Sequence, residues 1–317
     1  MAAIKAGVIG AGYLGKFHAE KYAGSPDAEL VAVADTDQDR SREIAARHGA
    51  RACTDYRDLF GNVQAVSIVV PTPLHHAIAR DCLLQGIDVL VEKPMTTTLA
   101  EADELIEIAR LKQLVLQVGH LERFNAALLA IRDVLKKPLF IESHRIAPYK
   151  ARGIEVDVIL DLMIHDIDII LNMVNAPVTS IQAVGVPILT AKNDIANVRL
   201  QFATGCIANV TASRISAKEM RKIRVFQNDA YLSIDFAAQA VDIFRKLPSK
   251  DVDGMPDITY DRIDIDQGDS LAQEIKAFLR AVRNREQPEV PGEAGRSALK
   301  VALEIVEQIQ ANQAAIN

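Results

Sequence analysis

A glycine-rich turn near the N-terminus constrains the fold more than any other feature of this 317-residue chain. The turn reads GAGYLG at residues 10–15, between an apolar, β-branched run at 4–9 and a helical pattern at 14–23. Its first glycine permits a tight turn, its second lets a phosphate approach the backbone, and its third brings the helix close to the strand. The free amides and positive helix end favour a pyrophosphate. We therefore expect Gly10, Gly12, Tyr13, Leu14 and Gly15 to bind a dinucleotide.

An acidic residue at the end of the second apolar run supports this interpretation. Asp35 follows Gly15 by 20 residues, where a carboxylate can accept hydrogen bonds from a ribose diol. The same charge would repel a 2′-phosphate, and no arginine stands at position 36 or 37. The pattern favours NAD over NADP as the cofactor. The alternative is a glycine turn of purely structural use.

The first 120 residues alternate between two kinds of hydrophobic pattern. Short runs that are apolar on both faces are typical of a parallel sheet covered by helices. These strands are expected at residues 4–9, 30–34, 65–70, 89–91 and 114–118, with helices at 14–23, 38–48, 76–85 and 99–111. The last helix begins with a capping box whose N-cap is Thr98. The alternation predicts an α/β fold, with a doubly wound Rossmann domain over residues 1–120.

The pattern changes after residue 120. A strand is expected at 139–147, successive strands between 180 and 263, and helices at 124–136, 154–174, 271–282 and 294–310. This predicts a second, α+β domain over residues 121–317 with a large, mostly antiparallel sheet whose one face is open. The C-terminal helices are expected to pack back on the first domain.

Two turns follow strands of the predicted parallel sheet. Ligands bind at the carboxyl ends of such strands, so Thr72 and Pro73 should lie along the cofactor. His76, or its neighbour His75, is a candidate contact to the nicotinamide ribose or the substrate. The alternative for each histidine is a cap on the following helix.

The second turn is Glu92-Lys93-Pro94. A lysine at a strand end points into the cofactor crevice, where its ammonium can stabilise a developing alkoxide. A cis bond before Pro94 would aim the lysine inward. The alternative is a surface tripeptide.

A histidine and an aspartate share a face of the predicted helix at 154–174. Asp161 and His165 are four residues apart, so they can form a base and its orienting partner. His165 has an ordinary pKa near ~6.5 and can accept a proton at neutral pH. Asp168 should lie near the same face, whereas Asp166 should point elsewhere. The alternatives are a metal site and an ordinary helix surface. We expect no metal, because no second histidine cluster is present.

Net charge and composition indicate which kinds of binding partner and cellular location to expect. Net charge is −6 and lysines and arginines form no cluster, so nucleic acid is not an expected partner. The three cysteines are widely spaced, as in reduced cytoplasmic proteins. The most apolar segment, 156–174, carries five ionisable residues, which argues against a membrane span. We also recognise no targeting segment and expect a cytoplasmic protein.

Taken together and in this order, these motifs resemble those of the Gfo/Idh/MocA oxidoreductases. The resemblance covers the whole chain and implies an NAD(P)-dependent dehydrogenase acting on CH–OH groups. It implies that Lys93 and His165 are catalytic and that Asp161 supports them. Glu92 and Lys93 would also contact the cofactor, and Lys93, Asp161 and His165 the substrate. The open sheet face would form a homodimer or homotetramer.

A narrower resemblance rests on residues 119–125, GHLERFN, together with the Asp161–Asp168 segment. Both are similar to nucleotide-sugar 3-dehydrogenases, which include enzymes acting on UDP-N-acetylglucosamine. His120, Arg123 and Asn125 are then expected to bind substrate, Arg123 by pairing with a diphosphate. The predicted reaction is hydride transfer between a sugar or nucleotide-sugar secondary alcohol and the nicotinamide. The alternatives are an inositol- or hexose-type polyol dehydrogenase, a non-catalytic NAD or sugar sensor, and a metal-dependent hydrolase or lyase.

Overall fold

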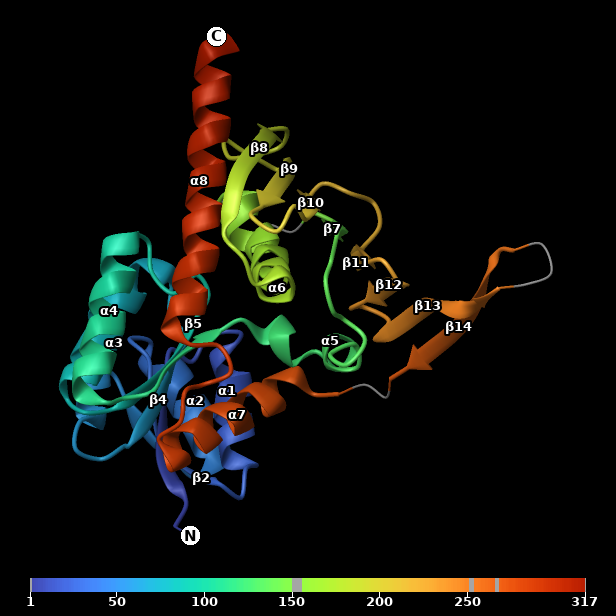
Figure 1. Ribbon diagram of the computed structural model, residues 1–317. Coiled ribbons are helices and arrows are strands. Elements are labelled where there is room, and N and C mark those ends of the chain that lie inside the picture. The colour runs from blue at the N-terminus through green and yellow to red at the C-terminus, as the bar shows by residue number, and fades with distance from the viewer. Residues whose placement is uncertain (1, 150–155, 251–253, 266–267, 317) are drawn as a thin grey trace. The chain divides into compact units, whose positions relative to one another are not determined.

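The structure is a computed structural model that describes residues 2–149, 156–250, 254–265 and 268–316 (Figure 1). Its internal contacts divide the chain into two compact units. The first contains Met1–Leu121 and Asp269–Leu299, and the second contains Glu122–Gly268 and Lys300–Asn317. Each unit is described by itself.

The first unit is built around a parallel sheet of six strands. They are β1 (Ile4–Ile9), β2 (Ala28–Ala34), β3 (Arg51–Cys53), β4 (Ala65–Ile68), β5 (Asp88–Glu92) and β6 (Leu116–Gly119). Their order is β3-β2-β1-β4-β5-β6, with every pair parallel. This is the doubly wound arrangement that the sequence predicts. Strand β3 was not expected, because three residues are too few to show a period.

Helices α1 to α4 connect strands of this unit, and α7 joins it from later in the chain. They are α1 (Gly15–Ala23), α2 (Gln38–His48), α3 (His75–Leu84), α4 (Leu99–Lys112) and α7 (Ser270–Asn284), with 3₁₀ turns η1 (Tyr56–Leu59) and η2 (Thr72–Leu74). The predicted capping box is present, since Thr98 accepts from the Glu101 amide and Glu101 bonds the Thr98 amide. Helix α4 therefore begins where the sequence indicates.

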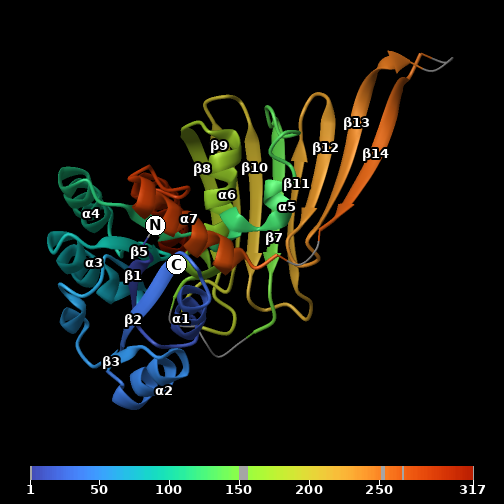
Figure 2. The same cartoon turned by 90° about the horizontal axis from the view of Figure 1, so that it is seen from below.

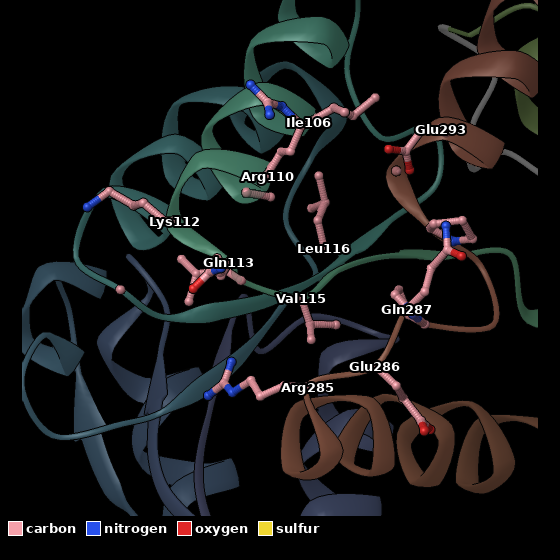
Figure 3. A pocket seen from close by; sticks show the side chains of 16 residues that line it. Ile106, Arg110, Lys112, Gln113, Val115, Leu116, Arg285, Glu286, Gln287 and Glu293 are labelled. Atoms are coloured by element: carbon pink, nitrogen blue, oxygen red, sulfur yellow. The ribbon is translucent and has the colours of Figure 1, made fainter.

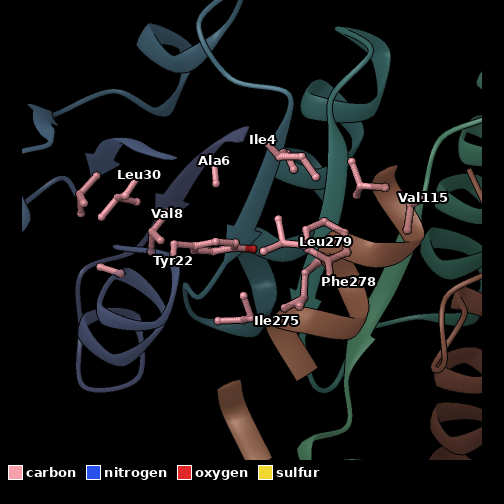
Figure 4. Close-up of a cluster of buried hydrophobic side chains, with 14 of the residues drawn as sticks. Ile4, Ala6, Val8, Tyr22, Leu30, Val115, Ile275, Phe278 and Leu279 are labelled. Carbon is pink, nitrogen blue, oxygen red and sulfur yellow. The ribbon is translucent and has the colours of Figure 1, made fainter. Parts of the chain in front are cut away.

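Helix α7 completes the core of the first unit. Its apolar face presents Ile275, Phe278 and Leu279 to the cluster that holds Val8 and Tyr22 (Figure 4). All five of these side chains are at most 1% exposed. A segment that follows the second unit's strands in the chain thus supplies part of the first unit's core.

The second unit contains an eight-stranded sheet (Figure 2). Its strands are β7 (Phe140–Ile146), β8 (Val178–Val186), β9 (Ile195–Phe202), β10 (Ile207–Ser213), β11 (Met220–Phe226), β12 (Ala230–Asp235), β13 (Ala240–Lys250) and β14 (Pro256–Asp264). The order is β14-β13-β12-β11-β7-β10-β9-β8. Only the β7–β10 pair is parallel. The mostly antiparallel sheet is confirmed, but β7 inserts between two strands that are otherwise consecutive.

Several helices after residue 120 differ from the expectation. The helix predicted at 124–136 is replaced by η3 (Leu121–Phe124), α5 (Ala126–Leu129) and a series of turns, because the Asn125 side chain accepts from the Ala127 amide and begins a new helix. Part of the helix predicted at 154–174 lies outside the described residues. Its remainder is a π-helix, η4 (Ile159–Met163), followed by α6 (Ile164–Val174). The last helix, α8, spans Gly292–Ile316. No helix within the described part of the chain is long and apolar enough to cross a membrane.

Candidate active site

The glycine-rich turn connects β1 to α1 at the carboxyl end of the sheet. Gly10 has a φ of +95°, and a Cβ there would lie 2.3 Å from the Val69 carbonyl oxygen. A Cβ on Gly15 would lie 1.8 Å from the Gly10 oxygen. At Gly12, by contrast, a Cβ would meet no described atom within 4 Å. Two glycines are therefore required by the turn itself, whereas the third leaves the open backbone that a phosphate needs.

The N-terminus of α1 carries no side-chain cap. Its N-cap residue is Leu14, which has no hydrogen-bonding side chain. The Lys16 amide donates to the Gly12 carbonyl oxygen at 3.2 Å, within the turn, and the positive end of the helix favours an anion there. The exposed Tyr13 and Leu14 stand at this opening. The residues present thus fit a dinucleotide pyrophosphate.

Asp35 follows β2 and binds the glycine turn directly. Its Oδ2 accepts from the Ala11 amide at 2.7 Å, and its Oδ1 accepts from the Asp37 amide at 2.9 Å. Each carboxylate oxygen has a second lone pair, so the side chain can also accept from a ribose diol. The structure adds a contact that the sequence analysis missed, because the Arg40 guanidinium lies 3.6 Å from Asp35.

Arg40 belongs to a basic group beside the turn. Lys16, Arg40 and Arg47 line a cavity of about 440 Å³ together with Gly12 and Tyr13. Arg40 and Arg47 come from one face of α2, a spacing that could have been noticed in the sequence. Glu43 lines the same cavity and pairs with Arg47.

The Glu92-Lys93-Pro94 turn ends β5, and its Lys93–Pro94 peptide is cis. Lys93 is half-buried at the carboxyl end of the sheet. Glu92 accepts from the Lys93 amide at 3.3 Å and pairs with His18 of α1 at 3.2 Å. The Glu92 side chain therefore fixes the backbone that presents Lys93. His18 was not recognised in the sequence, because it lies 74 residues away.

The two histidines after β4 have different environments. His75 is buried, and its ring nitrogens lie 2.9 Å from the Pro94 carbonyl oxygen and 2.8 Å from the Val70 carbonyl oxygen. Burial lowers the pKa of His75. His76 instead pairs with Glu104 of α4 at 2.8 Å. His75 therefore ties the Thr72-Pro73 turn to the Glu92-Lys93-Pro94 turn, whereas His76 contacts α4.

Asp161 and His165 lie in the second unit. Asp161 is within the π-helix η4 and His165 is in the first turn of α6. Both are half-buried, whereas Met163 and Ile164 between them are fully buried. The pair thus occupies the partly accessible side of this segment. A π-helical turn is a frequent feature of functional sites.

Two buried arginines hold the other carboxylates of α6. Arg123 makes a bidentate pair with Asp168 at 2.6 and 2.9 Å, and Arg145 bonds Asp166 at 2.9 and 3.1 Å and Glu122 at 2.9 Å. Burial opposes the charge of Arg145, yet the two carboxylates outweigh it and raise its pKa. Asp168 is therefore the bidentate partner of Arg123.

His120 and Asn125 are the remaining residues that the sequence predicts to contact substrate. His120 follows β6 and is 1% exposed. Asn125 caps α5 and donates to Glu122 at 3.3 Å. Among the described residues, no group of three His, Cys, Asp or Glu side chains is arranged to hold a metal ion.

A larger cavity of about 790 Å³ lies at the amino ends of β5 and β6 (Figure 3). Its rim mixes Arg110, Lys112 and Arg285 with Glu286 and Glu293. Because the glycine turn is at the opposite, carboxyl end of the strands, this cavity is separate from the candidate cofactor site.

The parallel sheet, its glycine turn, the carboxylate after β2 and the lysine after β5 define a dinucleotide-dependent oxidoreductase. Residues 4–120 match the model of an oxidoreductase family with an NAD-binding Rossmann fold, and residues 143–233 match the GFO/IDH/MocA C-terminal domain. The chain belongs to the Gfo/Idh/MocA family. The sequence predictions of this family, of a dehydrogenase and of NAD as its cofactor are confirmed.

Two curated relatives align over nearly the full chain. UDP-N-acetylglucosamine 3-dehydrogenase of Acidithiobacillus ferrooxidans is 38% identical over 309 residues, covering 97% of this chain and 98% of its own. Myo-inositol 2-dehydrogenase of Thermotoga maritima is 28% identical over 316 residues, covering 93% of each chain. A solved structure of the Acidithiobacillus enzyme superposes with a TM-score of 0.92 and covers 98% of this chain and 99% of its own.

Proposed function

We propose that this enzyme oxidises a secondary alcohol of a nucleotide sugar, with Lys93 and His165 acting on the same hydroxyl. The observation that supports the assignment is the partial exposure of each group within its own unit. Lys93 is half-buried at the carboxyl end of β5, and Asp161 and His165 are half-buried on a segment whose Met163 and Ile164 are fully buried. NAD supplies the hydride acceptor when it is bound.

Each residue has one role in the proposed mechanism. His165 takes the proton from the substrate hydroxyl, and Asp161 orients the imidazole and stabilises its charged form. The Lys93 ammonium stabilises the oxygen while it carries negative charge. Glu92 holds the Lys93 backbone through the hydrogen bond at 3.3 Å. In the cofactor site, Asp35 accepts from the ribose and the glycine turn holds the pyrophosphate.

UDP-N-acetylglucosamine is the substrate we propose. Support comes from the relative of that name, at 38% identity, and from the GHLERFN segment with its buried arginine. Because Arg123 already gives two donors to Asp168, only the rest of its guanidinium is available to a diphosphate. The second candidate is a polyol of the inositol type, which the Thermotoga relative favours.

The test follows reduced-cofactor absorbance with UDP-N-acetylglucosamine, UDP-N-acetylgalactosamine, myo-inositol and glucose. We expect turnover with the first at the lowest KM. Lys93→Met and His165→Asn should each lose turnover by ~10²–10⁴-fold and keep NAD binding. Lys112→Met, which removes an exposed lysine, is the control. Turnover of myo-inositol alone selects the second candidate, and wild-type turnover in either variant removes the catalytic assignment.

We also propose that the open face of the second sheet joins copies of the chain into a homodimer or homotetramer. An aromatic row crosses five strands on this face, through Phe140, Phe226, Tyr231, Phe244 and Tyr260. Neighbouring ring centroids are 4.8–5.6 Å apart, and the last two rings are exposed. Contiguous exposed apolar surface is typical of interfaces. Light scattering should show an oligomer that Phe244→Asp dissociates and Leu111→Asp, in the first unit, does not.

A cytoplasmic location is part of the same proposal. All three cysteines are free and buried. Burial raises the pKa of Cys82 to about 12 and that of Cys206 to about 11, so both thiols are unreactive. Free, protonated thiols are typical of a reducing compartment.

A further inference from the structure

A glutamate is buried in the core of the first unit. Glu274 lies on α7, and its side chain is 0% exposed. The residues that follow on the same face, Ile275, Phe278 and Leu279, pack into the apolar cluster (Figure 4). Neither carboxyl oxygen of Glu274 has a hydrogen-bond partner among the described residues. An ionised carboxylate in such a place would be very costly, so the geometry favours the neutral acid.

Among the described residues, no positive charge stabilises the ionised form of Glu274. From β6, Gln117 donates to the Glu274 backbone oxygen at 3.3 Å. From α1, the Tyr22 hydroxyl is bonded to Ser67 of β4 at 2.8 Å. From β5, Glu92 is paired with Gly119, two residues after Gln117 on β6, and a Cβ on Gly119 would meet the Glu92 carboxyl, so Glu92 and Glu274 lie on the same face of the sheet. Burial first, and the Glu92 charge second, raise the pKa of Glu274 well above its ordinary range.

The surroundings of Glu92, unlike those of Glu274, favour the charged carboxylate. Its two oxygens contact His18 and the Lys93 amide at 3.2 and 3.3 Å. Burial opposes its charge, but the hydrogen bond and charge of His18, followed by the charges of Lys93 and His75, lower its pKa. The backbone is shaped to accept it, since a Cβ on Gly119 would lie 3.1 Å from the Glu92 carboxyl carbon. The two carboxyls therefore have environments that separate their protonation, which is how enzymes divide one charge between two acids.

We propose that Glu274 is a positioning residue that acts as a neutral carboxylic acid. Because Glu274 is uncharged, Glu92 carries the only negative charge of these two carboxyls. Glu92 therefore keeps its hydrogen bond to the Lys93 backbone amide. The proposal rests on the proposed role of Lys93. A negative Glu92 beside Lys93 favours the ammonium form, which is the form that stabilises an alkoxide. Ionisation of Glu274 would place a second negative charge on the face of the sheet that holds Glu92, and this repulsion would weaken the contacts of Glu92 with His18 and the Lys93 amide. Activity is then expected to fall at the alkaline pH at which Glu274 ionises.

The first test compares pH profiles. Glu274→Gln keeps the shape and neutrality of the acid, so turnover at pH 7 should equal that of the wild type. In the pH profile of this variant, the loss of turnover at alkaline pH (the alkaline limb) should begin at least about one pH unit higher than in the wild type, because the Glu274 carboxyl that would ionise is gone. Glu107→Gln, at an exposed carboxylate paired with Arg110, is the matched control and should leave the limb in place. A tenfold loss of turnover at pH 7, or an unmoved limb, overturns the proposal.

The second test needs no turnover. The infrared spectrum of the wild-type protein at pH 7 should contain a protonated-carboxyl C=O band that Glu274→Gln removes and Glu107→Gln keeps. In Glu92→Gln this band should titrate at lower pH, because the like charge is absent. If the band is missing from the wild type, or its titration is the same in Glu92→Gln, the two carboxyls do not share a charge and the proposal is wrong. If Lys93 proves not to be catalytic, these spectra still report on Glu274 separately.

Discussion

Asp194 is the residue whose replacement gives the clearest stability prediction. It follows the loop between β8 and β9, and its Oδ2 accepts from three successive amides, those of Ile188, Leu189 and Thr190, at 2.7–2.9 Å. Its Oδ1 accepts from the Thr190 hydroxyl at 2.9 Å. Burial opposes the charge, yet these hydrogen bonds lower the pKa of Asp194 to about 2.

The magnitude follows from this pKa. The ordinary value for aspartate is ~3.9, and each pKa unit corresponds to ~1.4 kcal/mol, so the upper limit is ~2.6 kcal/mol at neutral pH. The carboxylate is buried, but Ile188 and Leu189 beside it are exposed, and solvent should reduce the effect to ~1–2 kcal/mol. Because the folded-state pKa is lowered, this stability is present above about pH 4 and disappears as the pH falls toward 2.

The assay is thermal unfolding of Asp194→Asn between pH 7 and pH 3, followed by calorimetry. At pH 7 the transition that includes the second unit should fall by ~2–8 °C, using ~2–4 °C per kcal/mol for a domain of this size. The difference from the wild type should shrink as the pH is lowered. Asp229→Asn, at an exposed carboxylate paired with Lys136, should cause little change at any pH. A difference that is absent at pH 7, or that persists undiminished at pH 3, would refute the reasoning.

Three further predictions concern the first unit. Asp35→Ser should weaken NAD and improve the use of NADP, because the Asp35 carboxylate beside Arg40 no longer repels a 2′-phosphate; an unchanged ratio of kcat/KM for the two cofactors counts against this role. Gly15→Ala should abolish NAD binding in fluorescence titrations, because the new Cβ would lie 1.8 Å from the Gly10 oxygen; binding at wild-type affinity would show that the turn can open. Thr98→Ala should lower the free energy of unfolding in urea by ~1 kcal/mol through loss of the α4 cap, and an unaltered midpoint would contradict that.

The local sequence determined much of the first unit. Its glycine turn and apolar runs predicted the strand–turn–helix unit and the parallel sheet, because each is a pattern between near neighbours. Strand ends also placed Asp35, Thr72 and Lys93 on one edge of the sheet, since the carboxyl ends of parallel strands meet there. The short β3 escaped notice because it has no measurable period.

What the sequence could not show depends on contacts between distant segments. Glu274 looks like one polar residue on an amphipathic helix, and only the packing of α7 reveals that it is buried. Asp168, the bidentate partner of Arg123, is 45 residues away in the sequence. Sequence alone therefore predicted a diphosphate contact for Arg123 and did not predict this ion pair. Nor can pattern alone reveal that β7 inserts between β10 and β11, because strand order is set by pairing rather than by periodicity.

Helix α7 has a consequence for synthesis on the ribosome. The N-terminal strands emerge first, but Ile275, Phe278 and Leu279 of their core are translated after the whole eight-stranded sheet. Part of the apolar surface of the nascent Rossmann unit therefore stays exposed until translation is nearly complete. Chaperones bind exposed apolar surface of this kind.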